Sequence, residues 1–155
     1  MDKVKTLKQL VAAWVRYRKS GGEYVNLSDD VDRYWREQLG DLYEQFYTDV
    51  DLDVSVGLGW IKLYVEACRK MKAVIDANPT VQLKVVQVKQ KFGGLRIYAQ
   101  VPGEGATVDL VKKAINEIIK CAAEEADRTC EVCGDPGALV SGAGIRVSCS
   151  KHSRI

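Results

Sequence analysis

The sequence predicts an α+β fold in which a small, mainly antiparallel sheet packs against helices and a cysteine-bearing tail follows. Apolar residues recur at helical spacing in four segments, and they alternate with polar residues in one short segment. A long β-type run is interrupted by a Gly-Gly pair, which is typical of a hairpin. The expected order is α-α-β-α-β-β-α-tail over 155 residues.

Two helices are expected near the N-terminus. Residues 3–19 carry an apolar stripe, which a Ser-Gly-Gly sequence at 20–22 ends. Ser28 is the expected N-cap of a second helix that runs to about residue 47, because serine is a preferred N-cap residue. Asp29 and Asp30 follow it, and acidic residues are favourable in the first turn of a helix.

A strand and a third helix are expected next. Apolar and polar residues alternate over 50–56, and Gly57 and Gly59 end that strand. Trp60 opens a helix that stops at Asn78-Pro79, because a residue before proline avoids the helical conformation.

The hairpin is the clearest β signal. Residues 81–92 and 95–101 are its expected strands, and Gly93-Gly94 is the expected turn. Leu95 and its alternate neighbours point to the core, whereas Arg96, Tyr98 and Gln100 point the other way. Thr107 is the expected cap of a fourth helix, which runs to about Asp127.

These elements group into three predicted parts. Residues 1–49 form a helical N-terminal extension and residues 50–128 form the α+β core. Residues 129–155, with C-x-x-C and C-x-x-H pairs typical of zinc ligands, form a zinc-binding tail packed on that core. A chain of this length can bury a core without the help of a metal.

The net charge of +2 hides a strong asymmetry. Residues 1–20 carry a net charge of +5, residues 21–53 of −8, and residues 54–104 of +5. Because local potential steers association, the acidic segment is a candidate partner surface. Its predicted members are Asp29, Asp30, Asp32, Glu37, Asp41 and Glu44. The alternative is an ordinary solvated helix face.

Four residues of the tail have the spacing of a zinc site. They form a C-x-x-C pair and a C-x-x-H pair, separated by 15 residues: Cys130, Cys133, Cys149 and His152. Zn²⁺ prefers such a Cys₃His set, and four protein ligands leave no open position, so the zinc is expected to be structural. A redox dithiol or an unmetallated cluster is the alternative. Cys68 and Cys121 are expected to be core thiols.

The sequence gives no sign of a membrane span or of secretion. No apolar run approaches the ~20 residues that a membrane helix needs, and no signal-peptide cleavage pattern follows the N-terminal lysines. The cysteine count is odd, at five. We therefore expect reduced thiols in a cytosol.

The hairpin also carries a candidate anion-binding site. Cations, an aromatic residue and a Gly-Gly pair gather near one end: Lys89, Lys91, Gly93, Gly94, Arg96 and Tyr98. Cations and free backbone N–H groups suit a phosphate. The alternative is a solvated hairpin whose lysines protect an edge strand.

Three motifs together resemble a known family. The run KQKFGGLRIY follows a Gly-Trp pair and precedes a helix that ends in RTCEVCGDPG and then SCSKH. In this order and spacing, residues 57–152 resemble a family of small uncharacterised bacteriophage and prophage proteins with a KFGGLRFY-like hairpin and a zinc knuckle. Members often carry a cysteine shortly before the Gly-Trp pair, where Val56-Gly57-Leu58 stand here.

The resemblance implies a phage accessory protein in the bacterial cytosol and no established activity. Such proteins are frequently counter-defence factors, so a binding protein that inhibits a bacterial defence system, anti-CRISPR or similar, is the first hypothesis. Capture of a small phosphorylated nucleotide signal and nucleic-acid binding are the alternatives. No P-loop, Ser–His–acid set or kinase motif stands out, so an enzyme is not expected.

Overall fold

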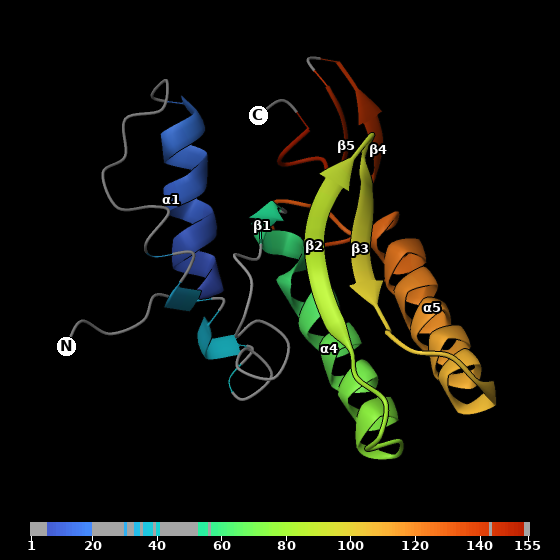
Figure 1. Cartoon of the computed structure of the whole chain (residues 1–155). Coiled ribbons are helices and arrows are strands. Elements are labelled where there is room, and N and C mark those ends of the chain that lie inside the picture. The colour runs from blue at the N-terminus through green and yellow to red at the C-terminus, as the bar shows by residue number, and fades with distance from the viewer. Residues whose placement is uncertain are drawn as a thin grey trace.

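The structure is a computed structural model that describes residues 6–19, 30, 33–34, 36–38, 40, 53–55, 57–142 and 144–153. The predicted α+β class is confirmed (Figure 1). Its elements are α1 (Leu7–Lys19), β1 (Asp53–Ser55), the 3-10 turn η1 (Leu58–Trp60), α4 (Ile61–Asp76), β2 (Lys84–Lys91), β3 (Gly94–Gln100), α5 (Ala106–Ala126), β4 (Ala138–Ser141) and β5 (Ile145–Ser148). The predicted helix over 28–47 lies largely outside the described residues.

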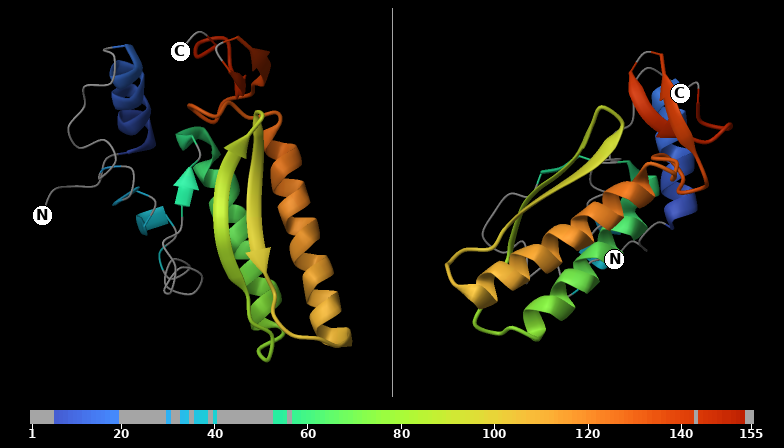
Figure 2. Two further views of the ribbon diagram at one scale, coloured as in Figure 1. Left: turned by 45° about the horizontal axis from the view of Figure 1, so that its top comes forward. Right: turned by 90° about the vertical axis from the view of Figure 1, so that its right-hand side faces the viewer.

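Helices α4 and α5 form one layer and the larger sheet forms the other (Figures 1 and 2). The strand order is β1-β2-β3. β2 and β3 are antiparallel, as predicted, but β1 pairs with β2 in parallel. A second, two-stranded antiparallel sheet of β4 and β5 stands at the end of the molecule where the β2–β3 turn lies.

The core lies between the two layers. In α4, buried residues recur at Ile61, Tyr64, Cys68 and Met71, which is the spacing of one helix face. They meet the buried strand residues Val85, Val88, Leu95 and Ile97 and the α5 residues Val111 and Ile115. The predicted sidedness of the second hairpin strand is confirmed, because Leu95 and Ile97 are buried whereas Arg96 and Tyr98 are exposed.

A β-bulge interrupts β2. Val85 and Val88 are both fully buried although they are three residues apart, which a strand of period two does not allow. The register shifts between Val85 and Gln87, so an extra residue is accommodated there. Beyond the bulge, Val88 returns to the core face while Gln87 and Lys89 lie on the outer face.

The hairpin turn lies one residue earlier than predicted. Lys91 pairs with Gly94, so Phe92 and Gly93 are the two turn residues and Gly94 already belongs to β3. Both have positive φ, +52° and +81°, which is the requirement of a type I′ turn. The prediction of a Gly93-Gly94 turn was wrong because Phe92 occupies a position that a bulky residue rarely adopts.

Two further details differ from expectation. Helix α5 begins at Ala106 with Gly105 at its N-cap, and no side chain caps it, so Thr107 lies inside the first turn. Cys121 is exposed rather than a core thiol, whereas Cys68 is buried as predicted.

The described part of the N-terminal extension packs on the core, since Leu10 of α1 is fully buried in the main cluster.

Candidate functional site: a metal centre and a basic hairpin face

The four predicted metal ligands lie close together. The three thiol sulfurs and one imidazole nitrogen of Cys130, Cys133, Cys149 and His152 are all within 4.8 Å of one another. The sulfurs of Cys133 and Cys149 are 3.8 Å apart. Nδ1 of His152 lies 3.3 Å from the Cys149 sulfur and 3.8 Å from the Cys130 sulfur.

The three individual separations fit a tetrahedral ion. Zinc bonds of about 2.3 Å to sulfur and about 2.05 Å to nitrogen place two sulfurs about 3.8 Å apart and sulfur and nitrogen about 3.6 Å apart. The contacts of 3.8, 3.3 and 3.8 Å depart from these values by no more than about 0.3 Å. A disulfide would need about 2.05 Å. The cluster can therefore bind a metal ion through four protein ligands.

A tight turn supplies the first ligand pair. The chain leaves α5 at Ala126, and the Cys130 N–H donates to the carbonyl of Asp135 at 2.7 Å. The Gly134 N–H donates to the Cys130 carbonyl at 2.9 Å, and Gly134 has φ of +84°. Glycine is suited to this conformation because it has no Cβ, so the turn holds both thiols on one side.

The β4–β5 hairpin supplies the second pair. Cys149 follows β5 directly, and the His152 N–H donates to the Cys149 carbonyl at 3.2 Å to form another turn. The Glu131 N–H donates to the Val147 carbonyl at 2.9 Å, which joins the two turns. The ligands are consequently held by backbone hydrogen bonds on both sides of the cluster.

The segment Gly57-Leu58-Gly59-Trp60 packs directly against the backbone of the first ligand turn, and we call it the seat of that turn. A Cβ at Gly57 would overlap the Glu131 carbonyl oxygen, and a Cβ at Gly59 would lie 2.5 Å from the Gly134 nitrogen. The Gly59 N–H donates to the Glu131 carbonyl at 2.8 Å. Trp60 is fully buried, and its indole N–H donates to the Thr129 carbonyl at 2.9 Å.

The sequence pattern does not predict this role. It indicates only that Gly57 and Gly59 end a strand, but in the fold they allow two backbones to touch. The available signal was two glycines spaced by one residue directly before a tryptophan, far from the cysteines in sequence. Only the fold reveals that the two segments meet.

The pKa values of two of the thiols, Cys133 and Cys149, shift in opposite directions. Burial first, and then hydrogen bonding with neighbouring thiols, raises the pKa of Cys133 to about 12 despite a backbone hydrogen bond from Asp135. Burial also acts to raise the pKa of Cys149, but hydrogen bonds from the Lys151 backbone and from its neighbouring thiols outweigh it and lower that pKa. One thiolate is thus favoured and another is disfavoured in a single cluster.

Helix α1 closes the cluster on another side. Cys130 is fully buried and Cys149 is 9% exposed, and both pack with the half-buried Trp14 and its neighbours Val11 and Val15. Residues from distant parts of the chain therefore meet at the ligands. The arrangement is that of a cross-link between elements.

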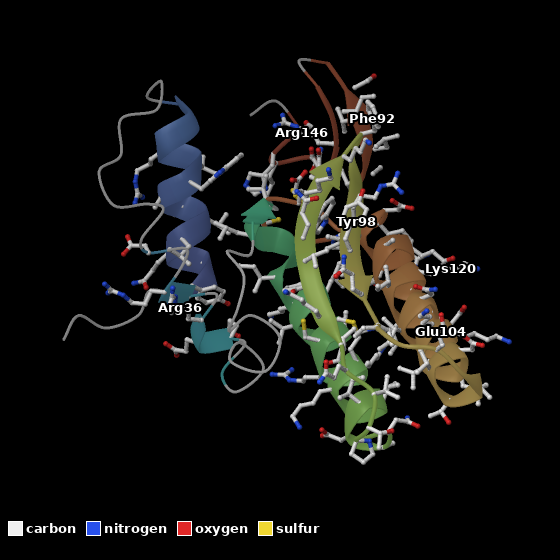
Figure 3. All side chains as sticks on the ribbon, viewed as in Figure 1. Arg36, Phe92, Tyr98, Glu104, Lys120 and Arg146 are labelled. Atoms are coloured by element: carbon white, nitrogen blue, oxygen red, sulfur yellow. The ribbon has the colours of Figure 1, made fainter. Side chains whose placement is uncertain are left out.

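The predicted cations and aromatic residue lie on the face of the β2–β3 hairpin opposite to the buried Val88 and Ile97: Lys89, Lys91, Arg96 and Tyr98. Figure 3 labels Tyr98 on this hairpin. Lys89 pairs with Arg96, and Gln87 pairs with Tyr98 beside them. The Lys89 ammonium lies 5.4 Å from the centroid of the Tyr98 ring, and Tyr98 is 40% exposed. The structure therefore brings two cations and an aromatic ring together.

The two glycines of the predicted anion site, Gly93 and Gly94, differ in position and burial. Gly93 is buried in the turn, whereas Gly94 pairs with Lys91 at the start of β3. Residues 81–103 contain four cations and no carboxylate, and residues 136–153 contain two cations and no carboxylate. Both hairpins are consequently free of acidic side chains of their own.

The predicted acidic surface is described only in part. Asp29, Asp32, Asp41 and Glu44 lie outside the described residues. Of the other two, Glu37 is exposed and Asp30 is half-buried. The acidic surface stays a prediction.

No protein-family model, curated protein or solved structure matches the chain. The resemblance to a phage protein family therefore stays a prediction from the motifs. Among the helices in the described ranges, none is both long enough and apolar enough to cross a membrane.

Proposed function

We propose that this chain is a binding protein that carries a structural zinc ion and binds a nucleic-acid strand on the outer face of the β2–β3 hairpin. The observation that carries the proposal is the Lys89–Arg96 cross-strand pair beside the exposed ring of Tyr98. Cations that track phosphates and rings that stack on bases are the two components of single-strand binding surfaces.

Zinc is the metal that best suits the four ligands. Three thiolates and one imidazole match its borderline softness, and three of their six separations lie within about 0.3 Å of those that its bond lengths require. Four protein ligands leave no coordination position for water or substrate. The proposed role is therefore to hold the tail in place rather than to catalyse a reaction.

An extended strand fits the hairpin face better than a small nucleotide does. Small-molecule sites usually bury most of the ligand in a concave pocket. Arg96 and Tyr98 are instead exposed side chains of strand β3. A cavity of about 480 Å³ exists beside the metal centre, lined in part by Trp14, Glu131 and Arg146, and it does not include the Lys89–Arg96 pair.

The cellular role predicted from the family resemblance is kept as a proposal. A phage protein in the bacterial cytosol that binds nucleic acid would compete with a defence system for the nucleic acid which that system recognises. Inhibition by direct protein binding would instead use the acidic segment. The hairpin chemistry favours the first of these routes, because its cations suit phosphates.

The test is the salt dependence of binding to a labelled oligonucleotide. The double variant Lys89→Gln/Arg96→Gln removes two phosphate contacts, so binding is expected to weaken and the slope of log K against log salt to fall by about 1–2. The control, Lys112→Gln/Lys120→Gln, removes two exposed cations from α5. Equal affinity of the two double variants, or no binding by the native protein at low salt, would refute the proposal.

A further inference from the structure

Phe92 is an exposed aromatic residue in a conformation that costs free energy. It is 73% exposed at the tip of the hairpin, with φ of +52° (Figure 3). Asn, Asp and Gly usually fill this position of a type I′ turn, because a bulky side chain is strained there. Since the ring is largely outside the core, packing does not explain why phenylalanine stands there.

The turn itself is held by the tail. A Cβ at Gly93 would lie 2.6 Å from Cδ1 of Leu139 and 3.1 Å from Cγ2 of Ile145, so β4 and β5 cover this glycine closely. The amide of Gln90 donates to the Ile145 carbonyl at 2.8 Å. The β4–β5 hairpin thus holds the turn in which Phe92 is exposed to solvent.

The surroundings of Phe92 repeat those of Tyr98. The Lys91 ammonium lies 5.8 Å from the centroid of the Phe92 ring, as Lys89 lies over Tyr98. Lys91 shares the outer face with Lys89, because the two are separated by one residue beyond the bulge. Two ring–lysine units therefore follow one another along the hairpin.

We propose that Phe92 and Tyr98 are two stacking platforms for unpaired bases, so that the ligand is single-stranded nucleic acid lying along the β2–β3 hairpin toward its tip. This inference rests on the proposed function and narrows its ligand. A duplex hides the faces of its bases, whereas a single strand can stack them on aromatic rings. The five residues from Gly94 to Tyr98 span about 13 Å, the length of about four stacked nucleotides.

The test compares three probes by fluorescence anisotropy at low salt. They are a labelled oligothymidylate of about ten nucleotides, a duplex of the same length, and a strand of the same length whose central sites are abasic. The abasic strand keeps its phosphates but lacks the bases that stack. We expect the native protein to bind the oligothymidylate most tightly and to lose affinity for both other probes.

The matched variants change only the ring. Phe92→Leu keeps an apolar side chain and is expected to weaken oligothymidylate binding by about 5- to 100-fold, whereas Phe92→Trp keeps a π face and restores it. Asparagine adopts positive φ at a lower cost in free energy than phenylalanine does. Phe92→Asn is therefore expected to raise Tm while weakening binding. Opposite shifts in Tm and affinity distinguish a binding residue from a structural one.

The outcomes separate the inference from the proposed function. Salt-dependent binding that does not change with Phe92→Leu, or that is equal for all three probes, overturns the stacking inference and leaves the proposed function standing. No binding of any probe overturns both.

Discussion

Gly59 illustrates how one residue couples the core to the metal centre. Gly59 is not among the glycines with positive φ, so any residue could adopt its backbone conformation. Glycine is required here only because there is no room for a Cβ atom. A Cβ would overlap the Cys130 carbonyl oxygen and would lie 2.8 Å from the Cys133 nitrogen. Because both neighbours are backbone atoms of the ligand turn, they cannot move without moving the ligands.

Substitution of this glycine is expected to affect folding and metal binding together. Gly59→Ala should lower the free energy of unfolding by about 1–3 kcal/mol or more, as overpacking does, and should weaken metal binding. Thermal unfolding and a competition assay with a chelator measure the two effects. Gly142→Ala is the control, since no atom lies within 4 Å of a Cβ there. Equal behaviour of the two variants would contradict the proposed seat.

The two cysteines outside the metal centre differ in burial. Cys68 is fully buried in the core, whereas Cys121 lies on an exposed part of α5. The apolar pattern of α5 did not predict this, because the buried face of that helix, formed by Val111, Ile115, Ala122 and Ala126, is narrower than the pattern indicates. The four metal ligands, in contrast, are predictable from their spacing, because two short turns can supply two ligands each.

At the scale of elements, the tail supports the hairpin tip. The β4–β5 hairpin bonds to the ligand turn through Glu131 and Val147, and it covers the Gly93 turn of the larger hairpin. The metal ion would therefore stabilise contacts at both ends of this small sheet. A two-stranded sheet alone is marginally stable in water, so such support is needed.

Removal of the metal should loosen the tail and spare the helical layer. With a chelator present, hydrogen exchange is expected to accelerate at the Glu131 and Gly134 amides, because their hydrogen bonds depend on the ligand turns. Amides in the middle of α4 should keep their protection, since that helix belongs to the main core. Mass spectrometry of peptides after exchange measures both. Uniform acceleration over the whole chain would contradict separate stabilisation.

The hairpin shows how far sequence patterns reach. The sequence pattern predicted both strands, and alternation in the second strand predicted the face on which Arg96 and Tyr98 lie. The pattern placed the turn one residue late, because a Gly-Gly pair normally outweighs a phenylalanine at positive φ. It also missed the bulge at Val86, since a bulge is set by how the strands meet the helices and leaves no distinct local signal.

At the scale of the whole molecule, the metal centre and the binding face form one chain of contacts. The ligands hold β4 and β5, these strands cover Gly93, and the turn presents Phe92 beside Lys91. The parallel pairing of β1 with β2 and the meeting of Gly59 with Cys130 are long-range features. Local periodicity does not encode such contacts, so only the elements themselves were predictable.

This chain of contacts predicts that metal removal weakens nucleic-acid binding. Chelation should reduce affinity for a labelled single strand, because a released turn no longer presents Phe92 in one conformation. Readdition of zinc should restore the affinity. Anisotropy with and without chelator measures it, and circular dichroism confirms that α4 and α5 remain helical. Unchanged affinity after complete metal loss would show that the face is independent of the tail.

Cys130, Cys133, Cys149 and His152 are expected to hold one ion together, and elemental analysis of the purified protein measures this. Zinc should be present at one equivalent per chain and should be lost in Cys149→Ser. The control Cys121→Ser, at an exposed cysteine, should retain it. A folded native protein without bound metal, or equal metal content in the two variants, would contradict the claim.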